Sequence, residues 1–187
     1  MDAIFDEKRL RNKIVLDAGK LFRVVDGLRG VNNRIVVTIG SWDLLHIGHV
    51  RYLIQARRRG DVLVVGVDTD RAIKLYKGPM RPVVPQDERC EMLCYQAPVD
   101  FVTLVDDIND KGKWQYGLIK KLRPDVFVAV EDSYPQKQRE EIKRYCGELV
   151  VLPRQAEETS TSQMIQNTVK KHLLSLVDAA GEKKTGG

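Results

Sequence analysis

Two histidines, His46 and His49, lie three positions apart in the segment Gly40–His49, which reads GSWDLLHIGH. Residues 35–39, just before it, are mostly β-branched, as in a buried strand, and residues 50–59 show helical spacing of apolar side chains. The histidines are therefore expected where a strand leads into the N-terminus of a helix, whose free amides and positive dipole end attract anions. Each imidazole adds a hydrogen-bond donor, so the segment predicts a phosphate-binding site.

The same histidines could instead be structural residues or zinc ligands. A histidine beside an apolar run is usually part of the core, and the H-x-x-H spacing by itself is a weak signal. A zinc site requires further ligands, but the third histidine, His172, lies far along the chain and the three cysteines lack paired metal spacing. The strand-to-helix context favours the phosphate site, with Gly48 leaving the space between the two rings free of a Cβ.

Further motifs follow along the chain, and their order carries a family resemblance. GSWDLLHIGH resembles the G-x-F-D-x-x-H-x-G-H signature of the cytidylyltransferase-like nucleotidyltransferases, with Trp42 in place of the usual phenylalanine. The segments RYLIQARRRGDVLVVGVDTD at 51–70 and KGPMRPVVPQDER at 77–89 are similar to those that come next in this family. TSTSQMI at 159–165 resembles the family's S-T-T-x-x-I motif, which opens the last helix. The resemblance spans residues 35–177.

The letters HIGH at 46–49 also match the signature of the class I aminoacyl-tRNA synthetases. A chain of 187 residues leaves no room for tRNA-binding domains, and it contains no K-M-S-K-S loop, so this related family is set aside. Within the cytidylyltransferase-like family, the middle of the chain most resembles the adenylyltransferase domain of ADP-heptose synthases. The glycerol-3-phosphate cytidylyltransferases come second.

This resemblance implies transfer of a nucleoside monophosphate from ATP or CTP to a phosphorylated sugar or polyol, with release of pyrophosphate. A heptose-type sugar 1-phosphate is the favoured acceptor, and glycerol 3-phosphate is the alternative. One segment departs from the heptose enzymes, because Val130–Tyr134 reads VEDSY where they carry K-G-G-D-Y. This departure leaves the identity of the nucleotide base and of the acceptor undetermined. It also allows an alternative of another class, a catalytically silent nucleotide-binding sensor or scaffold.

The resemblance also assigns roles to individual residues. Lys77 would bridge the incoming phosphate and the triphosphate, and Arg89 would assist, which makes the catalytic set His46, His49, Lys77 and Arg89. Mg²⁺ would be carried by the triphosphate, and no metal site made of protein side chains is expected. The nucleotide-binding residues would be Ile39, Gly40, Ser41, Trp42, Asp43, Gly48, Asp132, Arg154, Ser160, Thr161 and Ser162.

Each of these assignments has a structural alternative. Asp43 could order its loop, Lys77 could be a surface lysine, and Arg89 could be an ordinary ion-pair partner. Trp42 could pack in the core. The hydroxyls of Ser160–Ser162 could simply cap a helix, because hydroxyl residues are favoured at that position in any protein.

Strands and helices must alternate along the chain to position these residues. The predicted strands are Ile35–Ile39, Val62–Val67, Phe101–Leu104, Asp125–Val130 and Leu149–Leu152. The predicted helices are Ile47–Arg58, Asp70–Tyr76, Gln86–Gln96, Lys113–Leu122, Gln136–Tyr145 and Thr161–Leu176. The alternation predicts an α/β fold, a Rossmann-like doubly wound five-stranded parallel sheet with helices on both faces. The ligand is expected at the carboxyl ends of the strands, where the strand order reverses.

Composition bounds the remaining possibilities. With 43% hydrophobic residues among 187, the chain can bury one core. We expect an N-terminal helical extension at 1–33, a nucleotidyltransferase domain at 34–177 and a disordered tail at 178–187. The net charge is +5, but basic and acidic residues are interspersed, so no nucleic-acid partner is expected.

The chain shows no apolar run of membrane-spanning length and no signal-peptide pattern. Its three cysteines lack paired spacing, as in proteins of a reducing compartment. These features predict a cytoplasmic protein without a membrane partner. The family resemblance adds the expectation of a homodimer.

Overall fold

The computed structural model describes residues 7–157 and 159–185, with side chains in the last helix described up to residue 175. Five parallel strands form one sheet in the order β3-β2-β1-β4-β5. The strands are β1 (Ile35–Gly40), β2 (Val62–Asp68), β3 (Phe101–Val105), β4 (Val126–Val130) and β5 (Glu148–Leu152). This doubly wound order confirms the fold class predicted from the sequence.

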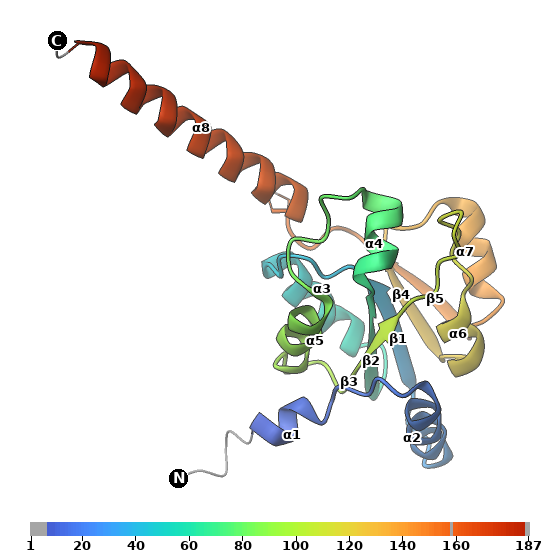
Figure 1. The fold of residues 1–187 in the computed structure, drawn as a ribbon. Coiled ribbons are helices and arrows are strands. Elements are labelled where there is room, and N and C mark those ends of the chain that lie inside the picture. Colours follow the sequence, from blue (N-terminus) through green and yellow to red (C-terminus); the bar gives the residue numbers. More distant parts are fainter. Residues whose placement is uncertain (1–6, 158, 186–187) are drawn as a thin grey trace, which may run out of the picture.

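Helices cover both faces of the sheet (Figure 1). On one face, Leu53 of α3 and Leu93 of α5 are fully buried, and on the other Leu21, Ile119 and Ile142 anchor α2, α6 and α7. None of the helices among the described residues is long and apolar enough to cross a membrane. The helices are α1 (Glu7–Arg11), α2 (Ala18–Gly30), α3 (Ile47–Arg57), α4 (Asp70–Lys77), α5 (Gln86–Cys94), α6 (Gly117–Leu122), α7 (Gln136–Lys143) and α8 (Thr161–Thr185).

Helix α6 begins four residues later than its predicted start at Lys113. Tyr116, just before the helix, has a left-handed backbone conformation with φ of 60°. Trp114 pairs with Ile108 in an isolated antiparallel bridge, which holds this stretch out of a helix. The apolar spacing of the segment is helical, but it does not reveal this local turn.

Helix α8 projects away from the sheet (Figure 1) and continues past its predicted end at Leu176. Residues 178–185 are therefore helical in the structure, where the sequence analysis places a disordered tail. This stretch reads DAAGEKKT, and apart from its single glycine it is compatible with a helix. Residues 186–187 lie outside the described residues.

The N-terminal extension packs directly on the sheet. Val15 donates its backbone N–H to Val102 O of β3 (2.8 Å), and the Val102 N–H donates to Lys13 O (2.8 Å), so this segment covers an edge strand. Leu21 and Val25 of α2 are buried in the same core as strand β1. Residues 1–6 of the predicted extension lie outside the described residues.

The strand order reverses between β1 and β4, and these strands diverge toward their carboxyl ends. Strand β1 pairs with β2 along its whole length, but only Val36 and Val37 pair with β4. Beyond them the hydroxyl of Tyr52, from α3, donates to Val128 O (2.8 Å) and lies 2.8 Å from Thr38 Oγ1. The divergence opens the crevice in which sheets of this type bind ligands.

Candidate active site

A cleft of about 760 Å³ lies at the carboxyl ends of the strands. Its walls come from the loops after β1, β3, β4 and β5, from the end of β2 with α4, and from the start of α8. Asp43 and Arg89 are the two predicted site residues that do not line it. The cleft brings together the other predicted residues, which are Ile39, Gly40, Ser41, Trp42, His46, Gly48, His49, Lys77, Asp132, Arg154, Ser160, Thr161 and Ser162.

His46 and His49 begin α3 and cap its N-terminus with their own side chains. The His46 Nδ1 accepts from the Gly48 N–H (3.1 Å), and the His49 Nδ1 accepts from the His46 N–H (3.4 Å). The two rings stack with 4.0 Å between centroids. Because each Nδ1 is an acceptor, the proton of each neutral imidazole is on Nε2. Each ring at the cleft therefore keeps one N–H donor that its own helix does not use.

Gly48 and Trp42 determine where these rings lie. A Cβ at position 48 would come within 2.9 Å of His46 Cε1, so glycine is required there. Trp42 is buried, donates from Nε1 to Gly66 O (2.9 Å) and packs its ring edge-on against His49, with 5.5 Å between centroids. Trp42 thus has the core role that was the structural alternative, and it also forms part of the cleft wall.

Both imidazoles are neutral at physiological pH. Burial lowers the pKa of His46. Burial also lowers the pKa of His49 to about 3, and the neighbouring His46 and the charge of Lys77 add to this effect. Neutral rings suit the role of hydrogen-bond donors to phosphate, because each can donate from Nε2 without first gaining a proton.

The displaced pKa of His49 predicts how the stability of the protein depends on pH. An unfolded histidine titrates near pH 6.5, whereas folded His49 has a pKa of about 3. The stability contributed by neutral His49 is full above about pH 6.5 and is lost as the pH falls toward about 3, because the unfolded state binds the proton first. Urea unfolding of the wild type from about pH 7.5 to 5 should show a steeper loss of stability than that of His49→Gln. Equal pH dependence of the stability of the two proteins would contradict the lowered pKa of His49.

Lys77 ends α4 and lies at the cleft beside the loop that leads to the histidines. Its Nζ donates to Ser41 Oγ at 2.8 Å. Burial lowers the pKa of Lys77, and the nearby charge of Arg81 lowers it further. The Lys77 side chain is exposed, but its hydrogen bond to Ser41 holds the ammonium group at the cleft, which favours a functional role over the surface-lysine alternative.

The hydroxyl cluster at the start of α8 lies at the same cleft. Thr161 Oγ1 donates to Asp43 O (2.6 Å), so the two motifs meet although 118 positions separate these residues. Ser160 Oγ accepts from the Gln163 N–H (3.2 Å) and caps the helix, as the structural alternative proposed. The hydroxyl of Ser162 has no hydrogen-bond partner among the described residues, so it stays available at the cleft.

Arg154 and Asp132 form an ion pair across the loops that follow β5 and β4. Arg154 Nε donates to Asp132 Oδ2 at 2.7 Å, and the two side chains are 54% and 45% exposed. Ion pairs this exposed are weak. The guanidinium group can therefore exchange the carboxylate for a phosphate at little cost.

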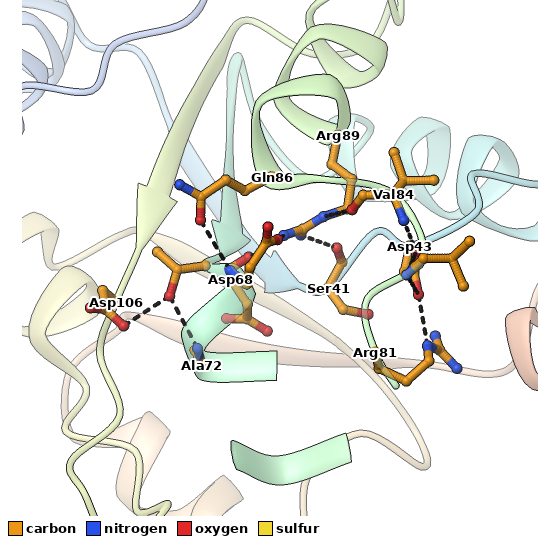
Figure 2. Close-up of polar contacts among 12 residues, drawn as sticks. Ser41, Asp43, Asp68, Ala72, Arg81, Val84, Gln86, Arg89 and Asp106 are labelled. Carbon is orange, nitrogen blue, oxygen red and sulfur yellow. Dashed lines mark hydrogen bonds and ion pairs between the residues drawn. The ribbon is translucent and has the colours of Figure 1, made fainter. Parts of the chain in front are cut away.

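Asp43 makes structural contacts, which favour its alternative as a loop-ordering residue over the nucleotide assignment. Its carboxylate is fully buried and accepts from Arg81 Nε (2.7 Å) and from the N–H groups of Val83 and Val84 (3.0 Å each), as Figure 2 shows for Arg81 and Val84. Burial alone would raise the pKa of Asp43, but these hydrogen bonds and the Arg81 charge outweigh it and lower the pKa. Asp43 fastens the loop after β1 to the segment that follows α4.

Arg89 also makes structural contacts, which favour its alternative as an ion-pair partner over the catalytic assignment. Its side chain is fully buried, and it donates to the backbone carbonyls of Val84 and Ser41 (Figure 2). It also donates to Asp68 O (2.9 Å) and forms an ion pair with Asp70 (2.6 Å). All three guanidinium nitrogens donate to protein groups, so Arg89 holds these segments together beneath the cleft.

The cleft also contains residues to which the sequence motifs assigned no role. Asp68 ends β2, and Tyr76 precedes Lys77 on α4. Trp114 and Tyr134, from the loops after β3 and β4, stack with 5.4 Å between centroids. A signal existed for Asp68, since a polar residue at the carboxyl end of an apolar strand lies at the edge where ligands bind.

The fold and the cleft define an α/β protein of the nucleotidyltransferase type, in which the N-termini of α3 and α8 line one crevice. Residues 37–172 match the model of the cytidylyltransferase-like family, and the chain belongs to this family. The family and the enzyme class predicted from the sequence, a nucleotidyltransferase, are thereby confirmed.

Curated relatives carry the name bifunctional protein HldE. That of Desulfatibacillum aliphaticivorans is 35% identical over 150 residues, which are 79% of this chain and 29% of the relative. That of Methylobacillus flagellatus is 38% identical over 141 residues, which are 74% of this chain and 28% of the relative. The chain therefore spans less than a third of the length of these relatives.

Two solved structures share the fold. A lipopolysaccharide core biosynthesis protein from Thermoplasma volcanium matches with a TM-score of 0.56 and 22% identity, over 65% of this chain and 98% of the other. A pantoate-beta-alanine ligase from Francisella tularensis matches with a TM-score of 0.55 and 13% identity, over 77% of this chain and 67% of the other.

Proposed function

We propose that this chain transfers a nucleoside monophosphate from ATP to a sugar 1-phosphate of the heptose type and releases pyrophosphate. The observation that carries the proposal is the pair of neutral imidazoles at the N-terminus of α3, which share one cleft with Lys77 and the start of α8. The resemblance of the middle of the chain to the adenylyltransferase domain of ADP-heptose synthases favours the heptose acceptor.

In the proposed reaction, a phosphate oxygen of the acceptor attacks the α-phosphorus of the triphosphate in line. The new P–O bond forms as the bond from the α-phosphorus to the bridging oxygen breaks, and pyrophosphate leaves with that electron pair. The nucleophile is already an anion, so no general base is needed, and the site contributes positioning and charge stabilisation. His46 and His49 donate from Nε2 as negative charge builds, and Lys77 holds the incoming phosphate against the triphosphate.

The β- and γ-phosphates are assigned to the start of α8, where backbone amides and the hydroxyl of Ser162 are available. Arg154 would leave Asp132 to join them. Mg²⁺ would arrive on the triphosphate, held by phosphate oxygens and water. The homodimer stays a prediction.

Glycerol 3-phosphate with CTP is the second candidate pair, favoured by an arginine, Arg154, that precedes the Ser-Thr motif and lines the cleft. Pyrophosphate release measured with ATP and CTP, each with heptose 1-phosphate and glycerol 3-phosphate, tests both candidates. We expect the fastest release with ATP and heptose 1-phosphate. Release only with CTP and glycerol 3-phosphate would replace the proposal by the second candidate. Triphosphate binding without pyrophosphate release from any pair would support the catalytically silent sensor, the alternative that the VEDSY segment suggests.

A further inference from the structure

The cleft has two ends on either side of strand β1. In the strand order, β4 and β5 lie on one side of β1, and their loops contribute Asp132 and Arg154. Strand β2 lies on the other side, and it leads through Asp68 into α4 with Tyr76 and Lys77. The proposed triphosphate follows β1, Arg154 and α8, so the end built on β2 and α4 is free for the acceptor.

Asp68 and Tyr76 form a hydrogen-bonded pair within this end of the cleft. The Tyr76 hydroxyl donates to Asp68 Oδ2 at 2.6 Å. Oδ1 of Asp68 has no hydrogen-bond partner among the described residues, and it is not sealed from solvent. Burial and the nearby carboxylate raise the pKa of Tyr76, so the phenol stays protonated and keeps its own oxygen available as an acceptor. The pair therefore presents two acceptor oxygens to a ligand.

A second carboxyl group at this end, Asp107, does not offer the same function. It accepts from Trp114 Nε1 (3.1 Å) and from the Gly117 N–H, and so holds the loop after β3. Both of these bonds end on Oδ2 and tie Asp107 to its own loop. Asp68 differs because, among the described residues, its carboxylate accepts only from Tyr76, which lines the cleft beside it. This contrast singles out Asp68 as the carboxylate that can bind a ligand.

Charge near Asp68 decides which donor suits it. Burial raises the pKa of Asp68 and the charge of Asp107 adds to the rise, whereas the hydrogen bond from Tyr76 and the charges of Lys77 and Arg89 oppose it. Arg89 is already paired with Asp70, so Lys77 is the cation that a ligand group at Asp68 would meet. A ligand ammonium would be repelled by Lys77. A neutral hydroxyl donor is not repelled by this charge, and a phosphate on the same molecule can reach the neighbouring Lys77.

We infer that Asp68 and Tyr76 form a subsite that binds a hydroxyl group of the phosphorylated acceptor, a reading that rests on the proposed function. The subsite selects phosphorylated sugars and polyols over phosphorylated amines. It also gives the acceptor an orientation, with its phosphate at Lys77 and its hydroxyl at Asp68, the end of β2, and at Tyr76, the residue before Lys77 on α4.

Calorimetric titration tests the subsite without turnover. Heptose 1-phosphate, glycerol 3-phosphate and phosphoethanolamine are titrated into protein saturated with Mg²⁺ and the α,β-methylene analogue of whichever of ATP or CTP binds more tightly. We expect a hydroxyl-bearing phosphate to bind, and Asp68→Ala and Tyr76→Phe to weaken it about 10- to 100-fold, the effect of losing a hydrogen bond to a charged group. Affinity for the triphosphate analogue should change less than about twofold, because the pair lies away from it.

Tyr145→Phe is the matched control, because Tyr145 also donates to a carboxylate, Glu141 Oε1 at 2.9 Å, but does not line the cleft. It should leave both affinities unchanged. Tighter binding of phosphoethanolamine, no binding of either hydroxyl-bearing phosphate, or equal losses of acceptor and triphosphate affinity would each overturn the inference. Acceptor binding that depends on Asp68 and Tyr76, in a protein that releases no pyrophosphate, would uphold the subsite and refute the transferase.

Discussion

Replacing His46 or His49 with alanine is expected to slow turnover by on the order of 10²- to 10³-fold, the effect of removing one donor that stabilises transition-state charge. Each ring keeps its Nε2 proton for the phosphate because its Nδ1 accepts a backbone hydrogen bond of α3. The loss should therefore fall on kcat more than on KM for the triphosphate. Steady-state pyrophosphate release with the productive substrate pair from the panel measures it.

His46 also caps α3, so alanine at this position should cost about 1 kcal/mol of stability as well. His46→Asn separates the two roles, since the amide oxygen can cap the helix but the side chain does not reach as far as Nε2. We expect near-normal thermal stability with turnover still low. His172→Ala, on the exposed side of α8, is the control and should match the wild type. Turnover within about threefold of wild type for both alanine variants would move the histidines to the purely structural interpretation.

Replacing Arg89 with methionine is expected to destabilise the protein by about 3–5 kcal/mol, as when one partner of a buried ion pair is removed. The substitution leaves the carbonyls of Ser41, Val84 and Asp68 without a donor, and it leaves Asp70 without its cation. For a chain of this size that corresponds to a fall of roughly 6–20 °C in melting temperature. Thermal unfolding followed by circular dichroism measures the change.

Arg71→Met is the matched control, because Arg71 also pairs with a carboxylate, that of Asp106, but both side chains are 48% exposed. Its melting temperature should remain close to that of the wild type. If Arg89→Met melted like Arg71→Met and lost activity, Arg89 would have the catalytic role that the family resemblance first implied. Loss of stability together with loss of activity agrees with the structural role.

The fold was predictable from the sequence because its signals are local and repeated. Each strand is a short β-branched run, and each helix has apolar side chains at helical spacing, so the alternation defines a doubly wound sheet. The exception is the segment before Gly117, where the left-handed Tyr116 and the Trp114–Ile108 bridge interrupt a helical pattern. Such a turn depends on contacts with Asp107, which lies outside the window of a helix.

The candidate site was predictable where a motif includes the residue, but a motif does not reveal whether the residue touches a ligand. Asp43 and Arg89 belong to the motifs as firmly as His46 does, yet they bind backbone groups of neighbouring segments. Burial distinguishes the two kinds of residue, and burial is a property of the folded chain. Asp68 lies in the matched segment 51–70 without an assigned role, Tyr76 lies outside the matched segments, and the sheet order and α4 bring the two together.

The short stretch Ser41–Asp43 is held from two sides, since Arg89 binds the Ser41 carbonyl and Thr161 binds the Asp43 carbonyl. Its side chains add a link to Lys77 and three to the segment after α4. These contacts fix the floor of the crevice, and it cannot move without breaking several of them. The movements that admit substrates or release products therefore take place in the exposed walls. The ion pair between Asp132 and Arg154 is weak and exposed to solvent. It is therefore the contact that would break when the loops around the crevice move.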